Sequence, residues 1–119
     1  IEIWGSGKPL REFLWSEDMA DACVFIMQNR NFKDTVKEQK EIKNSHINIG
    51  ACVEISIAEL ADMIKDVIDF KGSFFYNTDK PDGTMKKLTD VSKLNNLGWK
   101  HEVALKDGVE RMYKWYKLI

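Results

Sequence analysis

The sequence predicts a small α/β domain in which short strands alternate with helices. Two observations support this class. Short apolar segments bounded by glycine, proline and asparagine recur along the chain, and segments with helical periodicity separate them. The chain has 119 residues, enough for one small domain, and 44% of them are hydrophobic, enough for a packed core.

The first two elements are expected to be short strands around a turn. IEIWG (1–5) reads as the inside of a strand, the breaker cluster GSGKP follows, and LREFLW (10–15) alternates again. Because there is no initiator methionine and the chain opens inside a strand, we interpret it as a piece of a longer protein.

A helix is expected over 16–29. Ser16 is the predicted N-cap, and Glu17 and Asp18 would favour its positive end. Since ACVFIM (22–27) is apolar nearly all round, we expect deep burial. Residues 30–45 are charged and weakly periodic, which indicates a solvated loop or a frayed helical extension rather than a nucleic-acid patch.

The middle of the chain predicts strand, helix, strand. HINIG (46–50) and SFFYN (73–77) read as strands. Between them SIAE (56–59) fits a capping box, and Gly72 would end the region. The expected apolar face of this helix comprises Ile57, Leu60, Ala61, Ile64 and Ile68.

Two further helices are expected near the end of the chain. Asp90 can cap a short one that Gly98 stops. The last helix covers roughly 105–118, and Ala104 stands where a serine or aspartate cap is usual. Its expected apolar stripe comprises Leu105, Val109, Met112, Tyr113 and Tyr116.

Composition excludes several classes of function. The net charge is −1, so no long-range field attracts DNA or anionic lipid, and any anion site must be local. Cys23 and Cys52 lie in apolar surroundings, which indicates buried, reduced thiols of a cytosolic protein. His46 and His101 have no second ligand at a usual spacing, so no metal site is expected.

Several short motifs resemble catalytic ones without their context. Tyr76 and Lys80 have the Tyr-x-x-x-Lys spacing, but Pro81 disfavours a helix there. Tyr113 and Lys117 fit a buried stripe and a helix end better than a catalytic pair. GSGKPL (5–10) lacks the third glycine and the following helix of a dinucleotide-binding loop, so it is interpreted as a turn.

One loop invites a functional interpretation. KPDGTMKKL (80–88) joins a Pro-Asp-Gly turn to three lysines, and Leu88 looks buried. From the residues alone it is either an ordinary solvated loop or a loop built to hold an anion, with Lys87 as a candidate cation.

Three segments together resemble a known family. WGSGKPLREFLWSEDMADA (4–22), HINIG and KPDGTMKKLTDVSKLNNLGW (80–99) resemble, in the same order, the C-terminal part of GDP-L-fucose synthases. These are NADP-dependent 3,5-epimerase/4-reductases of the extended short-chain dehydrogenase/reductase family. The resemblance implies that residues 1–119 are the C-terminal nucleotide-sugar (substrate) binding domain of a longer enzyme. The Rossmann domain, absent from this chain, would hold NADP and the catalytic groups.

The resemblance also implies a set of substrate contacts. Trp4, Arg11, Asp82 and Lys87 match the family's nucleotide-sugar contacts. Arg11 would offer a fork of donors to the diphosphate, and Lys87 a point charge to the same group or a donor to ribose. Asp82 would accept from a ribose hydroxyl or guanine N–H, and Trp4 would wall the sugar side or donate its indole N–H. The 80–88 loop would be one rim of the pocket and Arg11 the other, with the direction of Lys87 fixed where the chain re-enters the fold at Leu88. No catalytic, cofactor-binding or metal-binding residue is assigned. The fragment alone is expected to be inactive, and the full enzyme a cytoplasmic homodimer that binds a GDP-sugar.

Departures from the family and two alternatives remain open. WSED, GTMKK and the cysteine after HINIGA replace more usual residues, and Lys86 in place of arginine forfeits a bidentate phosphate contact. One alternative is another nucleotide-sugar epimerase or dehydratase of the same superfamily. The other is a free-standing, non-catalytic binding module.

Overall fold

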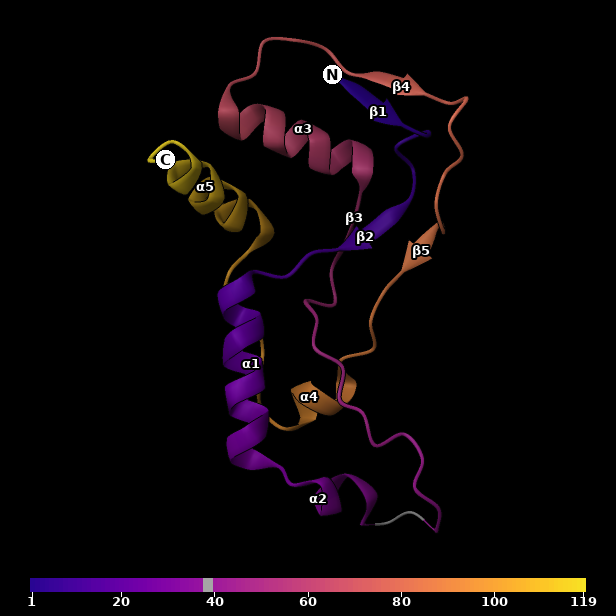
Figure 1. The fold of residues 1–119 in the computed structure, drawn as a ribbon, viewed down its shortest axis with the longest axis vertical. Coiled ribbons are helices and arrows are strands. Elements are labelled where there is room, and N and C mark those ends of the chain that lie inside the picture. The colour runs from indigo at the N-terminus through magenta and orange to yellow at the C-terminus, as the bar shows by residue number, and fades with distance from the viewer. Residues whose placement is uncertain (38–39) are drawn as a thin grey trace.

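The computed structural model describes residues 1–37 and 40–119, in which strands and helices alternate as the sequence predicts (Figure 1). The predicted α/β class is therefore confirmed. The elements in chain order are β1 (Glu2–Trp4), β2 (Leu10–Glu12), α1 (Ser16–Asn29), α2 (Phe32–Val36), β3 (Glu54–Ser56), α3 (Ile57–Ile68), β4 (Phe75–Asn77), β5 (Lys86–Lys87), α4 (Ser92–Asn96) and α5 (Leu105–Tyr116).

The strands of the described chain form two small sheets. β1 pairs in parallel with β4, while β2 lies between an antiparallel β3 and a parallel β5. β1 and β2 therefore belong to different sheets although only five residues separate them. Gly5 and Gly7 between them have positive φ angles of 85° and 74°, which glycine adopts at little cost. The predicted turn is thus a link between two sheets.

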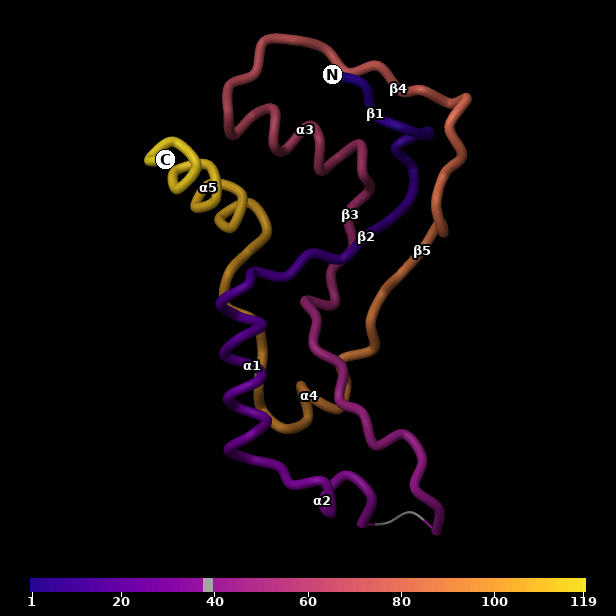
Figure 2. Tube along the Cα trace, in the orientation of Figure 1, coloured from indigo at the N-terminus to yellow at the C-terminus, as the bar shows by residue number. Residues whose placement is uncertain are grey.

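The molecule is elongated (Figure 2). Its extents are 56 × 36 × 21 Å, and its radius of gyration is 18.1 Å, whereas a compact domain of this length would have about 13–14 Å. Both sheets, α3 and α5 occupy one half, and α1, α2 and α4 the other (Figure 1). The packed core expected from the composition is small, because much of the apolar surface has no cover within the described residues.

A small core lies between α1 and α4. Ala22 and Leu94 are completely buried, and Trp99 is nearly so. The Trp99 indole N–H donates to the Asp21 carboxylate at 2.8 Å, which anchors the ring to α1. Partly buried side chains surround this core, namely Leu14, Phe25, Ile26, Ile47 and Ile49.

Helix α1 departs from the prediction at both its start and its surface. Its N-cap is Trp15 rather than Ser16, and no side chain caps it. Asp18 is buried and accepts a hydrogen bond from the Val103 backbone N–H at 3.0 Å, so it links α1 to the segment before α5. The expected deep burial is wrong, because Val24 is 51% and Met27 81% exposed. Within the described chain, only the face around Ala22 packs against other elements.

Residues 46–50 are not a strand, contrary to the prediction. A strand needs a hydrogen-bonded neighbour, and among the described residues none pairs with this segment. It is held instead by apolar packing and by side chains. The Asn48 amide donates to the Asp90 carbonyl at 2.9 Å.

The capping box of α3 is confirmed. The Ser56 hydroxyl accepts from the Glu59 N–H at 3.1 Å, and the Glu59 carboxylate accepts from the Ser56 N–H at 2.9 Å. α3 ends at Ile68, and its C-cap Asp69 has a left-handed conformation (φ 54°), so the helix stops before Gly72, the residue expected to end this region. The predicted apolar face is half-buried, with Ile64 38% exposed.

Short helix α4 and its stop agree with the prediction except at the cap. The N-cap is Val91, but the Asp90 carboxylate still accepts from the Ser92 N–H at 2.9 Å. Gly98 follows the helix with a φ of 96°. No helix of the described residues is both long enough and apolar enough to span a membrane.

Helix α5 begins at Leu105 after an N-cap, Ala104, that has no side-chain hydrogen bond. We expect Ala104→Ser to raise the free energy of unfolding by about 1 kcal/mol, because its hydroxyl can accept from a free N–H of the first turn. Chemical denaturation checks this. Ser56→Ala, which breaks an existing cap, should lower stability by a similar amount; an unchanged midpoint for Ala104→Ser would contradict the prediction.

Candidate functional site

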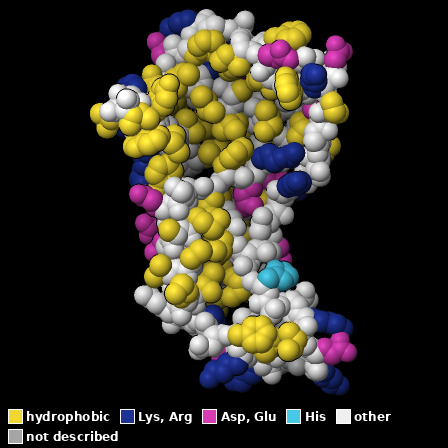
Figure 3. Space-filling view, in the orientation of Figure 1, with side chains coloured by type: hydrophobic (Ala, Val, Ile, Leu, Met, Phe, Trp, Pro, Cys, Tyr) yellow, Lys and Arg dark blue, Asp and Glu magenta, His cyan; other side chains and the backbone are white. Residues whose placement is uncertain are grey.

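The pairing of β2 with β5 brings two of the four predicted site residues together. Arg11 and Lys87 are register partners in this parallel pair, and paired residues of neighbouring strands project to the same face. Arg11 is half-buried, whereas Lys87 is exposed. Figure 3 shows Lys and Arg side chains beside β5, next to an acidic side chain and at the edge of the apolar surface over α3 and α5. The register thus puts two cationic side chains on one face of the sheet in a nearly neutral chain.

The Arg11 guanidinium ties β2 to the turn before β5. Its Nη1 donates to the carbonyl oxygens of Leu10 at 2.6 Å and Thr84 at 2.7 Å. A Cβ atom at Gly83 would lie 3.0 Å from Nη2, so the turn fits closely around the guanidinium. A guanidinium has five N–H donors, and these two bonds leave others for a ligand.

Asp82 is held by Ser6 in the turn after β1. The Ser6 N–H donates to Oδ1 at 2.7 Å, and the Ser6 hydroxyl donates to Oδ2 at 2.6 Å. Both hydrogen bonds lower the pKa of Asp82 below its ordinary 3.8, and the bond from the hydroxyl has the larger effect. The sequence contains no signal that could have paired these residues, since 76 positions separate them.

This pKa shift predicts a pH dependence. Above pH 3.8 the Asp82 carboxylate is ionised in the folded and unfolded chain, so its bonds to Ser6 stabilise the fold fully. That stabilisation is lost as the pH falls through the lowered folded pKa. An NMR titration of the Asp82 carboxyl carbon should give a midpoint below 3.8. Ser6→Ala should raise this midpoint, and a midpoint that Ser6→Ala leaves unchanged would contradict the assignment.

Trp4 lies at the end of β1 and is 71% exposed. The Lys80 ammonium is 5.4 Å from its ring centroid, within the range of a cation–π contact. Lys80 was not among the expected site residues. The opposite ring face is a candidate wall for a planar or apolar ligand group.

Lys86 and Leu88 differ from what the loop sequence suggested. Lys86 pairs in register with Leu10 and therefore projects to the opposite face from Lys87. Its ammonium forms an ion pair with Glu54 at 2.9 Å, so it stabilises the sheet rather than facing the site. The expected burial of Leu88 is wrong, since it is 41% exposed; β-pairing, not Leu88, sets the direction of Lys87.

The other residues singled out in the sequence lie outside this site. Cys23 and Cys52 are exposed free thiols, so their predicted burial is wrong. The Lys117 ammonium lies 4.7 Å from the Tyr113 ring centroid, on a solvent-facing helix end. Among the described residues, no cluster of three histidine, cysteine, aspartate or glutamate side chains could hold a metal ion.

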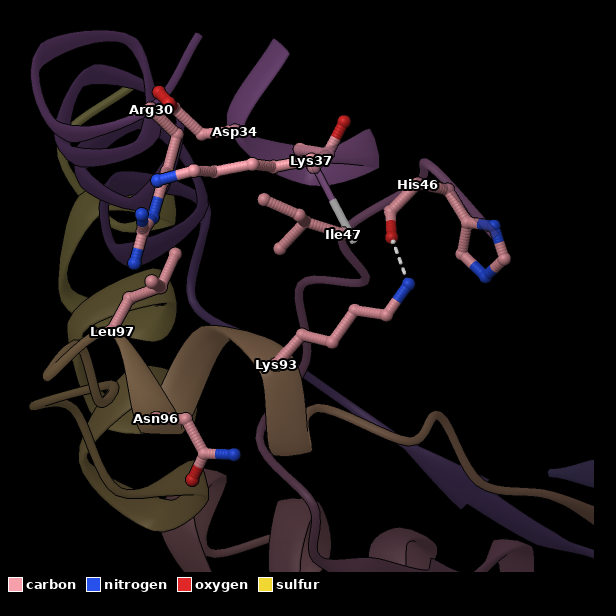
Figure 4. A pocket seen from close by; sticks show the side chains of 9 residues that line it. Arg30, Asp34, Lys37, His46, Ile47, Lys93, Asn96 and Leu97 are labelled. Carbon is pink, nitrogen blue, oxygen red and sulfur yellow. Dashed lines mark hydrogen bonds between the residues drawn. The ribbon is translucent and has the colours of Figure 1, made fainter. Parts of the chain in front are cut away.

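A separate pocket of about 620 Å³ lies near α2, at the end of the molecule remote from β1 and β4 (Figures 1 and 4). Arg30 and Lys37 extend toward each other across it (Figure 4). The Lys93 ammonium donates to the His46 carbonyl at 2.9 Å, while the His46 imidazole points away (Figure 4). This pocket contains none of the four predicted site residues.

Comparisons with known proteins agree with the resemblance seen in the sequence. Residues 1–50 match the NAD dependent epimerase/dehydratase family. The chain is 43% identical to GDP-L-fucose synthase 1 of Arabidopsis thaliana and 41% identical to GDP-L-fucose synthase of Escherichia coli, with 98% of this chain aligned in each case. These alignments cover 32% and 36% of those proteins.

This chain is similar to the C-terminal part of GDP-L-fucose synthases. The predicted resemblance is confirmed, and the chain spans about a third of the length of these curated relatives. A GDP-6-OMe-4-keto-L-xylo-heptose reductase from Campylobacter jejuni is 51% identical over 99% of this chain and 34% of its own, with a TM-score of 0.93. The fold is thus that of the C-terminal part of extended short-chain GDP-sugar enzymes, to which the GDP-L-fucose synthases belong.

Proposed function

We propose that residues 1–119 are the nucleotide-sugar binding domain of a longer GDP-L-fucose synthase. The whole enzyme would convert GDP-4-keto-6-deoxy-D-mannose to GDP-L-fucose by 3,5-epimerisation and NADPH-dependent reduction at C4. The observation that carries this proposal is the register pairing of Arg11 with Lys87, which puts two cations on one face. The similarity to GDP-L-fucose synthases supports the choice of ligand.

The four site residues would divide the binding of a GDP-sugar between them. Arg11 and Lys87 would bind the diphosphate, since a planar fork and a point charge both suit phosphate oxygens. Trp4 would form a wall with the ring face turned away from Lys80. Each Asp82 oxygen accepts one bond from Ser6 and keeps a lone pair for a ribose hydroxyl or a guanine N–H.

The described residues do not fit NADP, so the proposed cofactor would be bound by another part of the enzyme. The Gly5–Gly7 turn leads into β2, not into a helix whose N-terminus could hold a pyrophosphate. A Cβ at Gly7 would lie 2.6 Å from the Tyr76 ring, so that side chain fills the space beside the turn. We therefore assign this chain a role in binding and orienting substrate, and no step of the chemistry.

A second candidate is a different GDP-sugar of the same chemical class. The solved structure named above is a GDP-heptose reductase, and its 51% identity to this chain exceeds the 43% and 41% of the two fucose synthases named above. A heptose carries one more carbon than a hexose. Specificity between them would depend on residues around the sugar, whereas the diphosphate contacts would be shared.

Nucleotide preference and product identity test the proposal. Calorimetry on the full-length protein should show tighter binding of GDP than of UDP or dTDP, and a preference for UDP or dTDP would contradict the proposal. Incubation with GDP-4-keto-6-deoxy-D-mannose and NADPH should yield GDP-L-fucose. Conversion of a GDP-4-keto-heptose alone would favour the second candidate.

The proposal also covers the oligomeric state, the cellular location and the reaction steps of the whole enzyme. By resemblance to its family it would be a cytoplasmic homodimer with both isomerase and reductase steps. Light scattering on the full-length protein tests the oligomeric state, and a monomer would contradict it. The 119-residue chain alone should not convert substrate, because it supplies only part of the site.

A further inference from the structure

We infer that Ser6 is a positioning residue of the GDP-sugar site, which acts through Asp82 to hold the 80–84 turn against the segment that leads into β2. This inference rests on the proposed function. Ser6 supplies both of its donors, N–H and hydroxyl, to the two oxygens of one carboxylate, at 2.7 and 2.6 Å. A pair of charge-assisted bonds from one residue fixes the orientation of the carboxylate as well as its position.

The close approach of Asp82 depends on the glycine before Ser6. A Cβ at Gly5 would lie 2.4 Å from Asp82 Oδ1, and Gly5 has a φ of 85°. Any other residue would both clash with the carboxylate and strain the backbone. The turn between β1 and β2 is therefore shaped to receive Asp82.

Two further contacts fasten the same turn to β2. The Leu10 N–H donates to the Met85 carbonyl at 2.7 Å, and Arg11 donates to the Thr84 carbonyl at 2.7 Å. The turn from Asp82 to Met85 is thus held along its length by residues 6–11. Lys87 follows two residues later as the partner of Arg11.

The Ser6–Asp82 contact therefore bears on binding without Ser6 touching the ligand. A turn held in one conformation keeps Lys87 in register with Arg11 before the ligand arrives, so less conformational entropy is lost on binding. When the Ser6–Asp82 contact is broken, binding of the ligand must itself order the β2–β5 pair. Affinity for the diphosphate should then fall while the chemical step is unchanged.

Three variants of the full-length protein test this inference, namely Ser6→Ala, Ser6→Thr and Ser16→Ala. Ser6→Ala should speed hydrogen exchange in residues 82–87 and raise the KM for the GDP-sugar, each by about tenfold, with kcat unchanged. Ser6→Thr keeps the hydroxyl, so its hydrogen-exchange rate and its KM should both be close to those of the wild type. Ser16→Ala is the matched control, because that serine is exposed at the start of α1 and its hydroxyl has no hydrogen bond in the described chain.

The outcomes separate this inference from the proposed function. Faster exchange with an unchanged KM in Ser6→Ala would overturn the positioning role. A wild-type KM and wild-type exchange in that variant would do the same. If Arg11→Ala and Lys87→Ala also leave GDP binding unaltered, the proposed site itself is wrong. If only those two variants lose binding, the site stands and Ser6 has no part in it.

Discussion

Arg11→Ala in the full-length protein is expected to raise the KM for the GDP-sugar by on the order of tenfold or more. A charge-assisted hydrogen bond contributes about 1.5–3 kcal/mol, and 1.4 kcal/mol corresponds to about tenfold in affinity. Arg11 also holds the Thr84 carbonyl, so its loss should loosen the turn as well. Lys87→Ala should act in the same direction, because Lys87 is the register partner of Arg11.

Steady-state kinetics and separate NADPH titrations measure this effect. NADPH affinity should be nearly unchanged, since the described residues do not fit that cofactor. Arg11→Lys keeps one charge without the fork and should give an intermediate KM. Arg30→Ala is the control, because that arginine lies in the remote pocket near α2 (Figure 4). Equal loss of GDP-sugar and NADPH binding in Arg11→Ala would indicate misfolding and contradict a specific contact.

The helices could be predicted because their signals are local. The Ser56 and Glu59 capping box lies within four consecutive residues and marks the start of α3 correctly. The missing cap at Ala104 was equally visible in the sequence. The prediction of helix burial was wrong. Helix α1 is apolar around most of its circumference, yet within the described chain only the side near Ala22 packs against other residues. Periodicity cannot say what covers a helix.

Strand pairing could not be predicted, because it depends on segments far apart in the chain. Glu2 pairs with Phe75, and Leu10 pairs with both Ser56 and Lys86. The reading of 46–50 as a strand failed for the same reason: its residues suit a strand, but no described neighbour pairs with them. The strands β1 and β2 were located correctly, yet the sequence could not assign them to different sheets.

The candidate site shows the same difference between local sequence signals and contacts between distant segments. Resemblance alone led to the prediction that Arg11 and Lys87 bind the ligand, and the β2–β5 register then gave a physical reason for them to act together. Adjacent lysines at 86 and 87 look equivalent in the sequence, but strand alternation sends Lys86 to Glu54 on the other face. Ser6 escaped notice because a serine between two glycines is an ordinary turn residue until its partner, Asp82, is known.

Leu94→Ala is expected to lower the stability of the α1–α4 half by about 2–5 kcal/mol. Leu94 is the largest side chain of the described residues to be completely buried, and it packs with Ala22 and Trp99. Its truncation removes apolar contacts and leaves a cavity. In an elongated chain with so small a core, few other contacts can compensate, and total stabilities are only about 5–15 kcal/mol.

Hydrogen exchange in α1 of the full-length protein measures this loss locally. Amides of residues 20–29 should exchange roughly thirtyfold faster or more in Leu94→Ala, since each 1.4 kcal/mol is worth about tenfold. Leu118→Ala removes the same atoms from a side chain that is 85% exposed and should change exchange little. Exchange in β2 and β5 should also be unchanged, because those strands lie in the other half (Figure 1). Protection of α1 that survived Leu94→Ala would mean that another surface, outside the described residues, supplies the core that stabilises this helix.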